Sequence, residues 1–286
     1  LSESGMQNHP LTPMTDPNLV RVLQAQTPSR VGPIDHSVVA QGEAAIRTRI
    51  DQLKAEGVRM AVVDAVSNAD LLRLGPALKG MPLVTAGSGV AIGLPGNFGV
   101  APCNEAARLP AAQGLQAIVS GSCSVATNQQ VMDFIKAGKP ALAIDPLRIA
   151  AGVDVAAEAL AWAEGHIGQG PVLVYSTAEP SAVRAIQGKL GSEKAGAMVE
   201  DTIAAIARGL VQRGVRQLIV AGGETSGACV QALGITQMRI GAQIDPGVPW
   251  CHAVAPDAKD GLHITLKSGN FGGTDFFTKA FAQLQA

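Results

Sequence analysis

The sequence is poor in aromatic residues and has no surplus of charge. Six Phe, two Trp and one Tyr occur among 286 residues, so the core must be built from Ala, Val, Leu and Ile. Lys and Arg number 22 against 23 Asp and Glu, and the basic residues form no tract. A nucleic-acid-binding surface needs extra cations to neutralise phosphates. We therefore expect no nucleic-acid partner.

Long apolar runs and paired cysteines are also missing. No run reaches the roughly 18 apolar residues of a membrane-spanning helix, so we expect no membrane partner. The N-terminus lacks the basic region and apolar core of a signal peptide. Cys103, Cys123, Cys229 and Cys251 are widely separated and form no CxxC or zinc-binding pattern. This usage predicts reduced thiols and a cytoplasmic location.

Several catalytic motifs are absent as well. No loop fits GxxxxGK[ST], and neither GxGxxG nor GxSxG occurs. The five histidines form no HxxH or HExxH pattern, so they predict no metal site. The sequence therefore gives no support to a Walker-type ATPase, a serine hydrolase or a zinc enzyme. It also disfavours a nicotinamide-dependent oxidoreductase, which the fold pattern alone would allow.

Short apolar runs alternate with amphipathic segments along the chain. Such alternation is typical of an α/β protein with mostly parallel sheets. Residues 1–36 look irregular apart from a helix at 18–26. The expected strands are 58–64 (buried), 81–85, 115–119, 141–144, 172–175, 216–220, 238–244, 250–254 and 261–267. The expected helices are 41–56, 70–78, a segment ending at 136, 153–165, 194–213 and 274–284.

A stretch rich in Pro, Asn and Ala at 97–113 reads as a linker. We therefore expect two domains, residues 1–112 and residues 113–286. Each would contain a mostly parallel sheet flanked by helices, with a ligand cleft between the two domains.

Glycine- and hydroxyl-rich segments follow the expected strands. They are 87–89 (GSG), 120–122 (SGS), 176–179 (STAE), 222–227 (GGETSG) and 267–273 (KSGNFGG). In parallel sheets, ligands bind beyond the carboxyl ends of the strands. Glycine lets backbone N–H groups approach an anion, and a helix N-terminus adds partial positive charge. These segments together predict a phosphate site.

Each segment also has a purely structural interpretation. Ser176 or Thr177 would cap the helix that begins at Pro180, and Thr225 or Ser226 would cap the next one. Lys267, offered as a mobile cation for the phosphates, would otherwise be a solvated surface lysine. Glu224 is harder to explain structurally. A carboxylate on a phosphate-binding loop makes sense when a divalent metal or a ribose hydroxyl lies beside it.

Five ordered motifs now suggest a family. They are Asn8-His-Pro-Leu-Thr-Pro-Met14, Ser176-Thr-Ala-Glu-Pro180, Gly222-Gly-Glu-Thr-Ser-Gly227, Pro246-Gly-Val-Pro-Trp250 and Leu266-Lys-Ser-Gly-Asn-Phe-Gly272. Together they resemble the four-carbon acid sugar kinases, and the resemblance covers essentially the whole chain. It implies a domain for the sugar acid followed by a domain for the nucleotide.

The resemblance also implies an activity and its ligands. The reaction is the ATP-dependent phosphorylation of the terminal (4-) hydroxyl of a four-carbon sugar acid, with Mg²⁺. The foremost substrate is 3-oxo-tetronate, and threonate and erythronate are the alternatives. Lys267 comes from the residue pattern, and the rest of the predicted ATP-binding set comes from the resemblance: Ser120, Ser122, Gly222, Gly223, Glu224, Thr225, Ser226, Gly227 and Gly269. His9 is the candidate for the sugar acid.

One departure from the family pattern is large. Family members begin with a strand and an Asp-Asp-x-Thr-Gly-Ala segment, which this sequence does not contain. Residues 1–112 are therefore expected to be the rear part of the sugar-acid-binding domain, and no catalytic base can be assigned. A nucleotide-binding module without catalysis stays open as an alternative function. A homodimer stays open as the oligomeric state.

Overall fold

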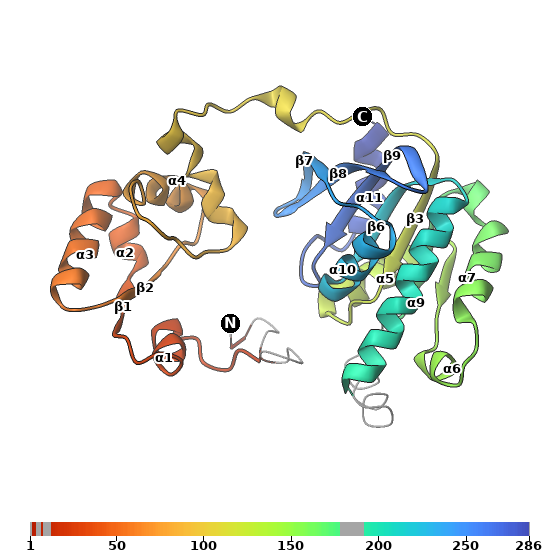
Figure 1. Ribbon diagram of the computed structural model, residues 1–286, viewed down its shortest axis with the longest axis horizontal. Helices are drawn as coiled ribbons and strands as arrows, with labels where there is room; N and C mark the ends of the chain where they lie inside the picture. Colours follow the sequence, from red (N-terminus) through yellow and green to blue (C-terminus); the bar gives the residue numbers. More distant parts are fainter. Residues whose placement is uncertain (1, 4–6, 8–12, 178–191, 286) are drawn as a thin grey trace. The chain divides into compact units, whose positions relative to one another are not determined.

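The computed structural model describes residues 2–3, 7, 13–177 and 192–285 (Figure 1). The chain divides into two compact units, Leu1–Pro102 and Cys103–Ala286. Each unit has its own buried core, and the two are described separately below.

The first unit is small and mostly helical. Its elements are α1 (Leu19–Gln24), β1 (Val31–Ile34), α2 (His36–Val39), α3 (Glu43–Ala55), β2 (Met60–Val63), α4 (Asn68–Ala77) and two 3-10 helices, η2 (Ser88–Ile92) and η3 (Pro95–Phe98). Strands β1 and β2 pair in parallel, with Val31 opposite Met60. Ile34, Ile46 and Leu74 are central to the buried core between this sheet and its helices.

Three sequence expectations for this unit were wrong. Residues 81–85 form no strand, and β1 lies in a stretch that was read as irregular. Strand β2 is mostly exposed rather than buried. The burial of β2 was misjudged because apolar content alone cannot tell a strand that is covered on both faces from one in a two-stranded sheet.

The second unit is built on a seven-stranded sheet. Its strands are β3 (Leu115–Ser120), β4 (Ala141–Ala143), β5 (Val172–Tyr175), β6 (Val215–Ala221), β7 (Met238–Asp245), β8 (Val248–Ala255) and β9 (Ala258–Lys267). Their spatial order is β4-β5-β3-β6-β9-β8-β7. The first five strands in this order run parallel, and β7 and β8 are antiparallel additions at one edge.

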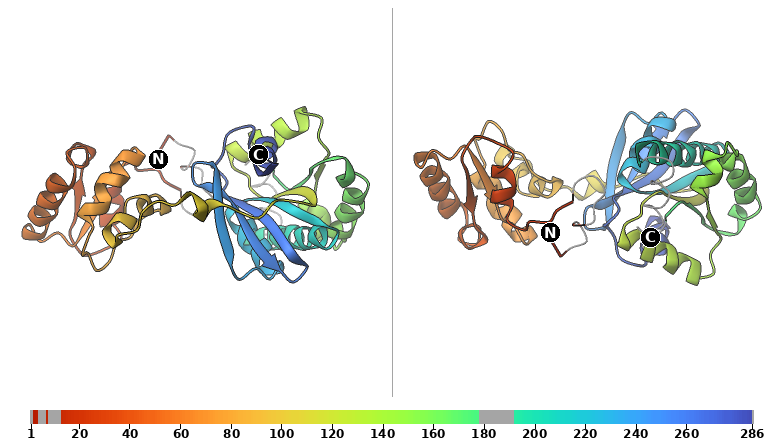
Figure 2. Two further views of the ribbon diagram at one scale, coloured as in Figure 1. Left: turned by 90° about the horizontal axis from the view of Figure 1, so that it is seen from above. Right: turned by 90° about the horizontal axis from the view of Figure 1, so that it is seen from below.

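Helices cover both faces of this sheet (Figure 2). One core contains residues of α7 (Val155–Glu164), α9 (Ser192–Gln212) and α10 (Gly223–Ala232), and α6 (Pro146–Ala150) packs beside α9. The other core contains residues of α5 (Val125–Lys136) and α11 (Phe276–Gln285). Along β6, Leu218 and Val220 enter the first core, whereas Ile219 and Ala221 enter the second. Burial on both faces explains the continuous apolar run at residues 218–221 of β6.

The sequence-based strands of this unit are confirmed, with boundaries that differ by at most three residues. The short helix α6 was missed because its five residues are too few to show a helical period. None of the described helices is long and apolar enough to cross a membrane.

Candidate functional site

One edge of the seven-stranded sheet brings together residues 176–177 and the segments 120–122, 222–227 and 267–273. They follow β5, β3, β6 and β9, which are parallel neighbours, so their carboxyl ends lie side by side. Backbone hydrogen bonds join them. Gly121 N–H donates to the Ala221 carbonyl at 3.0 Å, and Gly222 N–H donates to the Lys267 carbonyl at 2.8 Å. The predicted convergence of these loops is confirmed.

The GGETSG segment forms the start of helix α10. Gly222 precedes the helix with φ = 129°, a conformation that strongly favours glycine. No side chain caps this helix, so the interpretation of Thr225 or Ser226 as its N-cap is wrong. Ser226 Oγ donates instead to the Gly222 carbonyl at 2.6 Å. The first N–H groups of α10 are thus left for another acceptor, which suits an anion.

Gly121 and Gly223 differ in the space around them. A Cβ on Gly121 would lie 2.3 Å from Thr225 Oγ1, so the loop after β3 packs tightly against α10. A Cβ on Gly223 would have no atom within 4 Å, and Gly223 is exposed. Glycine at 121 is therefore required by packing. Glycine at 223 leaves an open approach to the backbone.

The hydroxyl groups after β3 lie at different depths. Ser120 is completely buried, and its Oγ lies 2.6 Å from Thr177 Oγ1 at the end of β5. Ser122 is only partly buried, and its Oγ donates to Ser124 Oγ at 3.3 Å. Of the two predicted ATP-binding serines, Ser122 is therefore the more accessible. A helix expected at Pro180 lies outside the described residues.

The loop after β9 rests on a buried cation. Lys267 is 0% exposed, and its Nζ donates to Thr127 Oγ1 at 2.9 Å and to the carbonyls of Ser268, Gly269 and Phe271 at 3.0–3.2 Å. Burial lowers the pKa of this ammonium to about 8. Lys267 is thus neither the solvated lysine nor the mobile cation that the sequence suggested.

Helix α5 also contributes to this loop, which sequence reasoning missed. Ser124 Oγ donates to the Gly269 carbonyl at 2.5 Å, and Thr127 Oγ1 donates to the same carbonyl at 2.9 Å. Gln130 Nε2 donates to three further carbonyls of the loop at 3.0–3.1 Å, and the side chain is fully buried. The spacing of Thr127 and Gln130 places them on one helix face, and two polar residues on a buried face are the signal that could have identified them.

Two carboxylates lie near the start of α10. Glu224 is exposed in its first turn, where the helix dipole favours a negative charge. Glu200 lies on α9, and its pKa is raised by burial, then by the negative charges of Glu224 and Asp201. Such repulsion favours a bound cation. In the described part of the chain, no group of three or more His, Cys, Asp or Glu could hold a metal.

The remaining predicted residues lie elsewhere. Gly87–Gly89 belongs to the first unit and lies at the start of η2. The expectation that this segment follows a strand was wrong, because residues 81–85 form none. His9, the candidate for the sugar acid, lies outside the described residues. The specific contacts proposed for the ATP-binding residues stay predictions.

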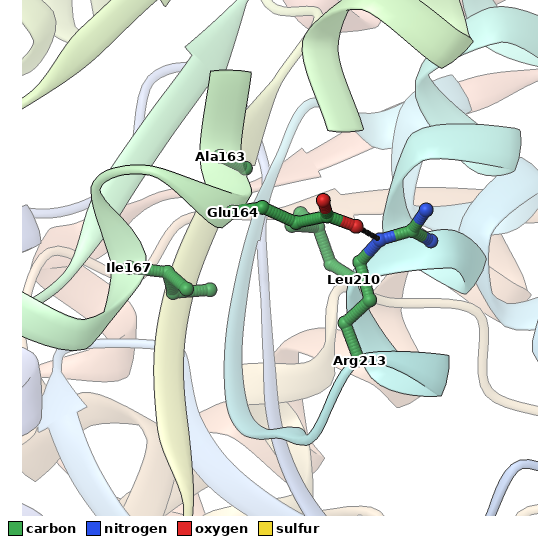
Figure 3. Close-up of a pocket in the computed structure, with 5 residues that line it drawn as sticks. All are labelled: Ala163, Glu164, Ile167, Leu210 and Arg213. Carbon is green, nitrogen blue, oxygen red and sulfur yellow. Dashed lines mark hydrogen bonds and ion pairs between the residues drawn. The ribbon is translucent and has the colours of Figure 1, made fainter. Parts of the chain in front are cut away.

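A hollow of about 270 Å³ lies at the other end of the strands (Figure 3). Ala163, Ile167 and Leu210 line it with apolar groups, and Arg213 Nε binds Glu164 Oε1 at 2.5 Å across its mouth. These residues precede β5 and β6 in the chain, so they lie beyond the amino ends of those strands. Ligands in such sheets bind at the opposite edge. This hollow is therefore not the candidate site.

Comparison with known proteins identifies both parts of the chain. Residues 117–277 match the family of the nucleotide-binding C-terminal domain. This range includes all four segments that follow the strands at the sheet edge. Residues 1–94 match the sugar-binding N-terminal domain. The chain belongs to the four-carbon acid sugar kinase family.

Individual relatives carry more specific names than the family. The chain is 54% identical over 288 residues to a protein of Cupriavidus necator named 3-oxo-tetronate kinase, and 54% identical over 287 residues to a Pseudomonas savastanoi protein of the same name. Each match covers 99% of this chain and 66% of the relative, so the chain spans slightly less than two thirds of their length. A solved protein of Haemophilus influenzae is 38% identical, with a TM-score of 0.66, over 99% of this chain and 68% of that one.

Proposed function

We propose that this chain takes part in the ATP-dependent phosphorylation of the terminal hydroxyl of a four-carbon sugar acid, with 3-oxo-tetronate as the acid. The observation that carries the proposal is the 54% identity to two proteins named 3-oxo-tetronate kinase over 99% of this chain. The convergence of four phosphate-type loops at one sheet edge supports it independently. Threonate and erythronate are the competing substrates within the family.

The ATP phosphates are proposed to bind at the start of α10. Phosphoryl transfer requires the protein chiefly to position two substrates and to offset charge on the phosphoryl group. The uncapped N–H groups of Gly223 and Glu224 point along the helix axis, where they suit phosphate oxygens. Ser122 and the loop after β9 border the same edge. The open approach at Gly223 admits a phosphate to the backbone.

Mg²⁺ is the proposed metal, and the residues present fit it. Glu224 and Glu200 repel one another, as the raised pKa of Glu200 indicates. Mg²⁺ in kinases is commonly held by one or two carboxylates together with substrate phosphates. These two side chains would hold it. When bound, the metal would neutralise charge that develops on the transferred phosphoryl group.

The sugar acid is assigned to the first unit, in keeping with the sugar-binding domain that residues 1–94 match. His9 is the residue proposed to bind the sugar acid. No residue is proposed as the catalytic base. A cytoplasmic location would suit an enzyme with four cysteines that form no disulfide, all of them in the described part of the chain.

Activity is tested by measuring ADP release with Mg²⁺ and each of 3-oxo-tetronate, threonate and erythronate. The proposal expects release that depends on the acid and is fastest with 3-oxo-tetronate. Calorimetry with ATP, ADP and NAD provides the binding arm. ADP binding without any turnover would favour the nucleotide-binding module, whereas binding of NAD in place of ATP would favour the oxidoreductase.

The position of the phosphates is tested by Gly223→Val. The new side chain enters open space, so the fold should persist, but it occupies the proposed approach of a phosphate to the backbone. The ATP affinity should fall by more than ~2 kcal/mol, the scale of lost charge-assisted hydrogen bonds. Gly168→Val is the matched control, because Gly168 is exposed, has no positive φ and leaves open space for the added side chain. Unchanged ATP affinity in Gly223→Val would remove this loop from the site.

A further inference from the structure

Lys267 is a buried cation without a counter-charge. It is 0% exposed, and within the described ranges it forms no ion pair with a carboxylate. Burial is the one cause that lowers its pKa. Burying a charge without a partner is unfavourable, so lysine is rarely kept in such a position for stability alone. Its charge is thus available to an anion that binds at this edge of the sheet.

The lysine determines which way the loop peptides face. Its Nζ binds the carbonyls of Ser268, Gly269 and Phe271, which all point inward. The peptide bonds of this loop are trans, so each inward carbonyl directs the next N–H to the opposite side. The N–H groups of Gly269 and Gly272 therefore face away from the lysine.

Gln130 continues the same arrangement along the loop. Its Nε2 binds the carbonyls of Phe271, Gly272 and Gly273. One N–H group of this outward face already binds an anionic oxygen: the N–H of Gly273 donates to Asp245 Oδ2 at 2.8 Å. Inward carbonyls over a cation and outward N–H groups together form a surface that is suited to phosphate.

We propose that Lys267 is a positioning residue for the nucleotide phosphates: it holds loop 268–273 with its N–H groups outward and supplies positive charge beneath them, without touching the nucleotide. This inference rests on the proposed nucleotide site. It assigns to Lys267 an indirect role in place of direct phosphate contact. Because the pKa of Lys267 is lowered to about 8, its ammonium group loses its charge in mildly alkaline solution.

The test compares Lys267→Met with Lys267→Arg and with Lys259→Met, which removes an exposed lysine from the same strand. Calorimetry measures the binding of ADP, tripolyphosphate and adenosine. Lys267→Met should weaken ADP and tripolyphosphate by about 10-fold or more, the scale of lost charge-assisted interactions. Adenosine, which has no phosphate, should bind within twofold of wild type. Lys267→Arg should recover part of the phosphate affinity, and Lys259→Met should match wild type.

A second measurement follows nucleotide affinity as a function of pH. The ADP affinity of the wild-type protein should decrease as the pH rises above 8, and this decrease should be absent in Lys267→Met. Hydrogen exchange reports the loop separately. The amides of Phe271 and Gly273, which are hydrogen-bonded to the Ser268 carbonyl and to Asp245 Oδ2, should exchange faster in Lys267→Met than in Lys259→Met, with no nucleotide present.

Three outcomes would overturn the inference. They are equal losses for adenosine and ADP in Lys267→Met, ADP affinity within twofold of wild type in a folded Lys267→Met, and a flat wild-type pH profile. Should Lys267→Met not fold, the wild-type pH profile and Lys267→Arg decide the question. Failure of the wild-type protein to bind ADP or tripolyphosphate would contradict the proposed function itself, which distinguishes the two failures.

Discussion

The hydroxyl oxygens of Ser120 and Thr177 lie 2.6 Å apart in a fully buried contact that joins the carboxyl ends of β3 and β5. The N–H of Ser176 donates to the Ser120 carbonyl at 2.9 Å and reinforces the same junction. Two loops of the candidate site are therefore held together beneath the surface by groups that need not contact a ligand.

Removing one partner of this pair should leave a buried hydroxyl without its hydrogen bond. We expect Ser120→Ala to lower the free energy of unfolding by ~1–3 kcal/mol, and Thr177→Val to have a similar effect. The double variant should lose less than the sum, because the second change removes the unpaired group. Urea denaturation of the four proteins measures this. Loss of ADP affinity in Ser120→Ala but not in Thr177→Val would show a direct contact by Ser120; equal small losses would show a structural role.

Gly121→Ala should be poorly tolerated. The added Cβ would lie 2.3 Å from Thr225 Oγ1, so the loop or helix α10 must move. Overpacking of this kind costs about 1–3 kcal/mol in the free energy of unfolding. Gly223→Ala is the matched control, since its Cβ meets no atom within 4 Å. The double variant Gly121→Ala/Thr225→Ala should recover part of the stability, and a melting temperature no higher than that of Gly121→Ala would contradict the clash.

Glu224→Gln should lower the pKa of Glu200, because it removes a nearby negative charge. NMR titration of the Glu200 carboxyl measures this shift. If both carboxylates hold Mg²⁺, the variant should also weaken the Mg²⁺ dependence of nucleotide binding. Asp201→Asn is a useful comparison, since Asp201 also raises the pKa of Glu200 but is not assigned to the metal. Equal effects of both variants on Mg²⁺ dependence would argue against a specific carboxylate pair.

Stability should depend on the ionisation of Lys267. Its pKa is about 8 in the folded protein against the ordinary lysine value of 10.5, so the unfolded chain binds more protons between these values. The free energy of unfolding should therefore rise with pH from about 8 to about 10.5, by up to about 3 kcal/mol from this group. Well below pH 8 Lys267 is protonated in both the folded and the unfolded state, so this group causes no rise there. Chemical denaturation across this range in wild type and Lys267→Met isolates the contribution, and parallel curves would contradict it.

The sequence alone predicted the strands of the second unit and the sheet edge at which its glycine- and hydroxyl-rich segments meet. The strands β3, β5 and β6 are buried on both faces, and each contains a continuous apolar run: 117–119, 172–174 and 218–221. Strand β9 is also mostly buried, but polar residues interrupt its apolar ones. Each of the four strands is followed directly by glycine or hydroxyl residues, and parallel strands bring such residues to one edge. Five ordered motifs indicated the family, which the comparisons confirmed.

What only the tertiary structure decided is the depth and partner of each side chain. Lys267 is the last residue of β9 and borders a glycine loop, and in the sequence it cannot be told from a surface lysine. Its role depends on Thr127, which is 140 residues away in the chain, and on carbonyls whose directions follow from the loop backbone. Strand β1 was missed for a related reason: its pairing with β2 and its burial against α3 come from long-range contacts, which local apolar content does not record.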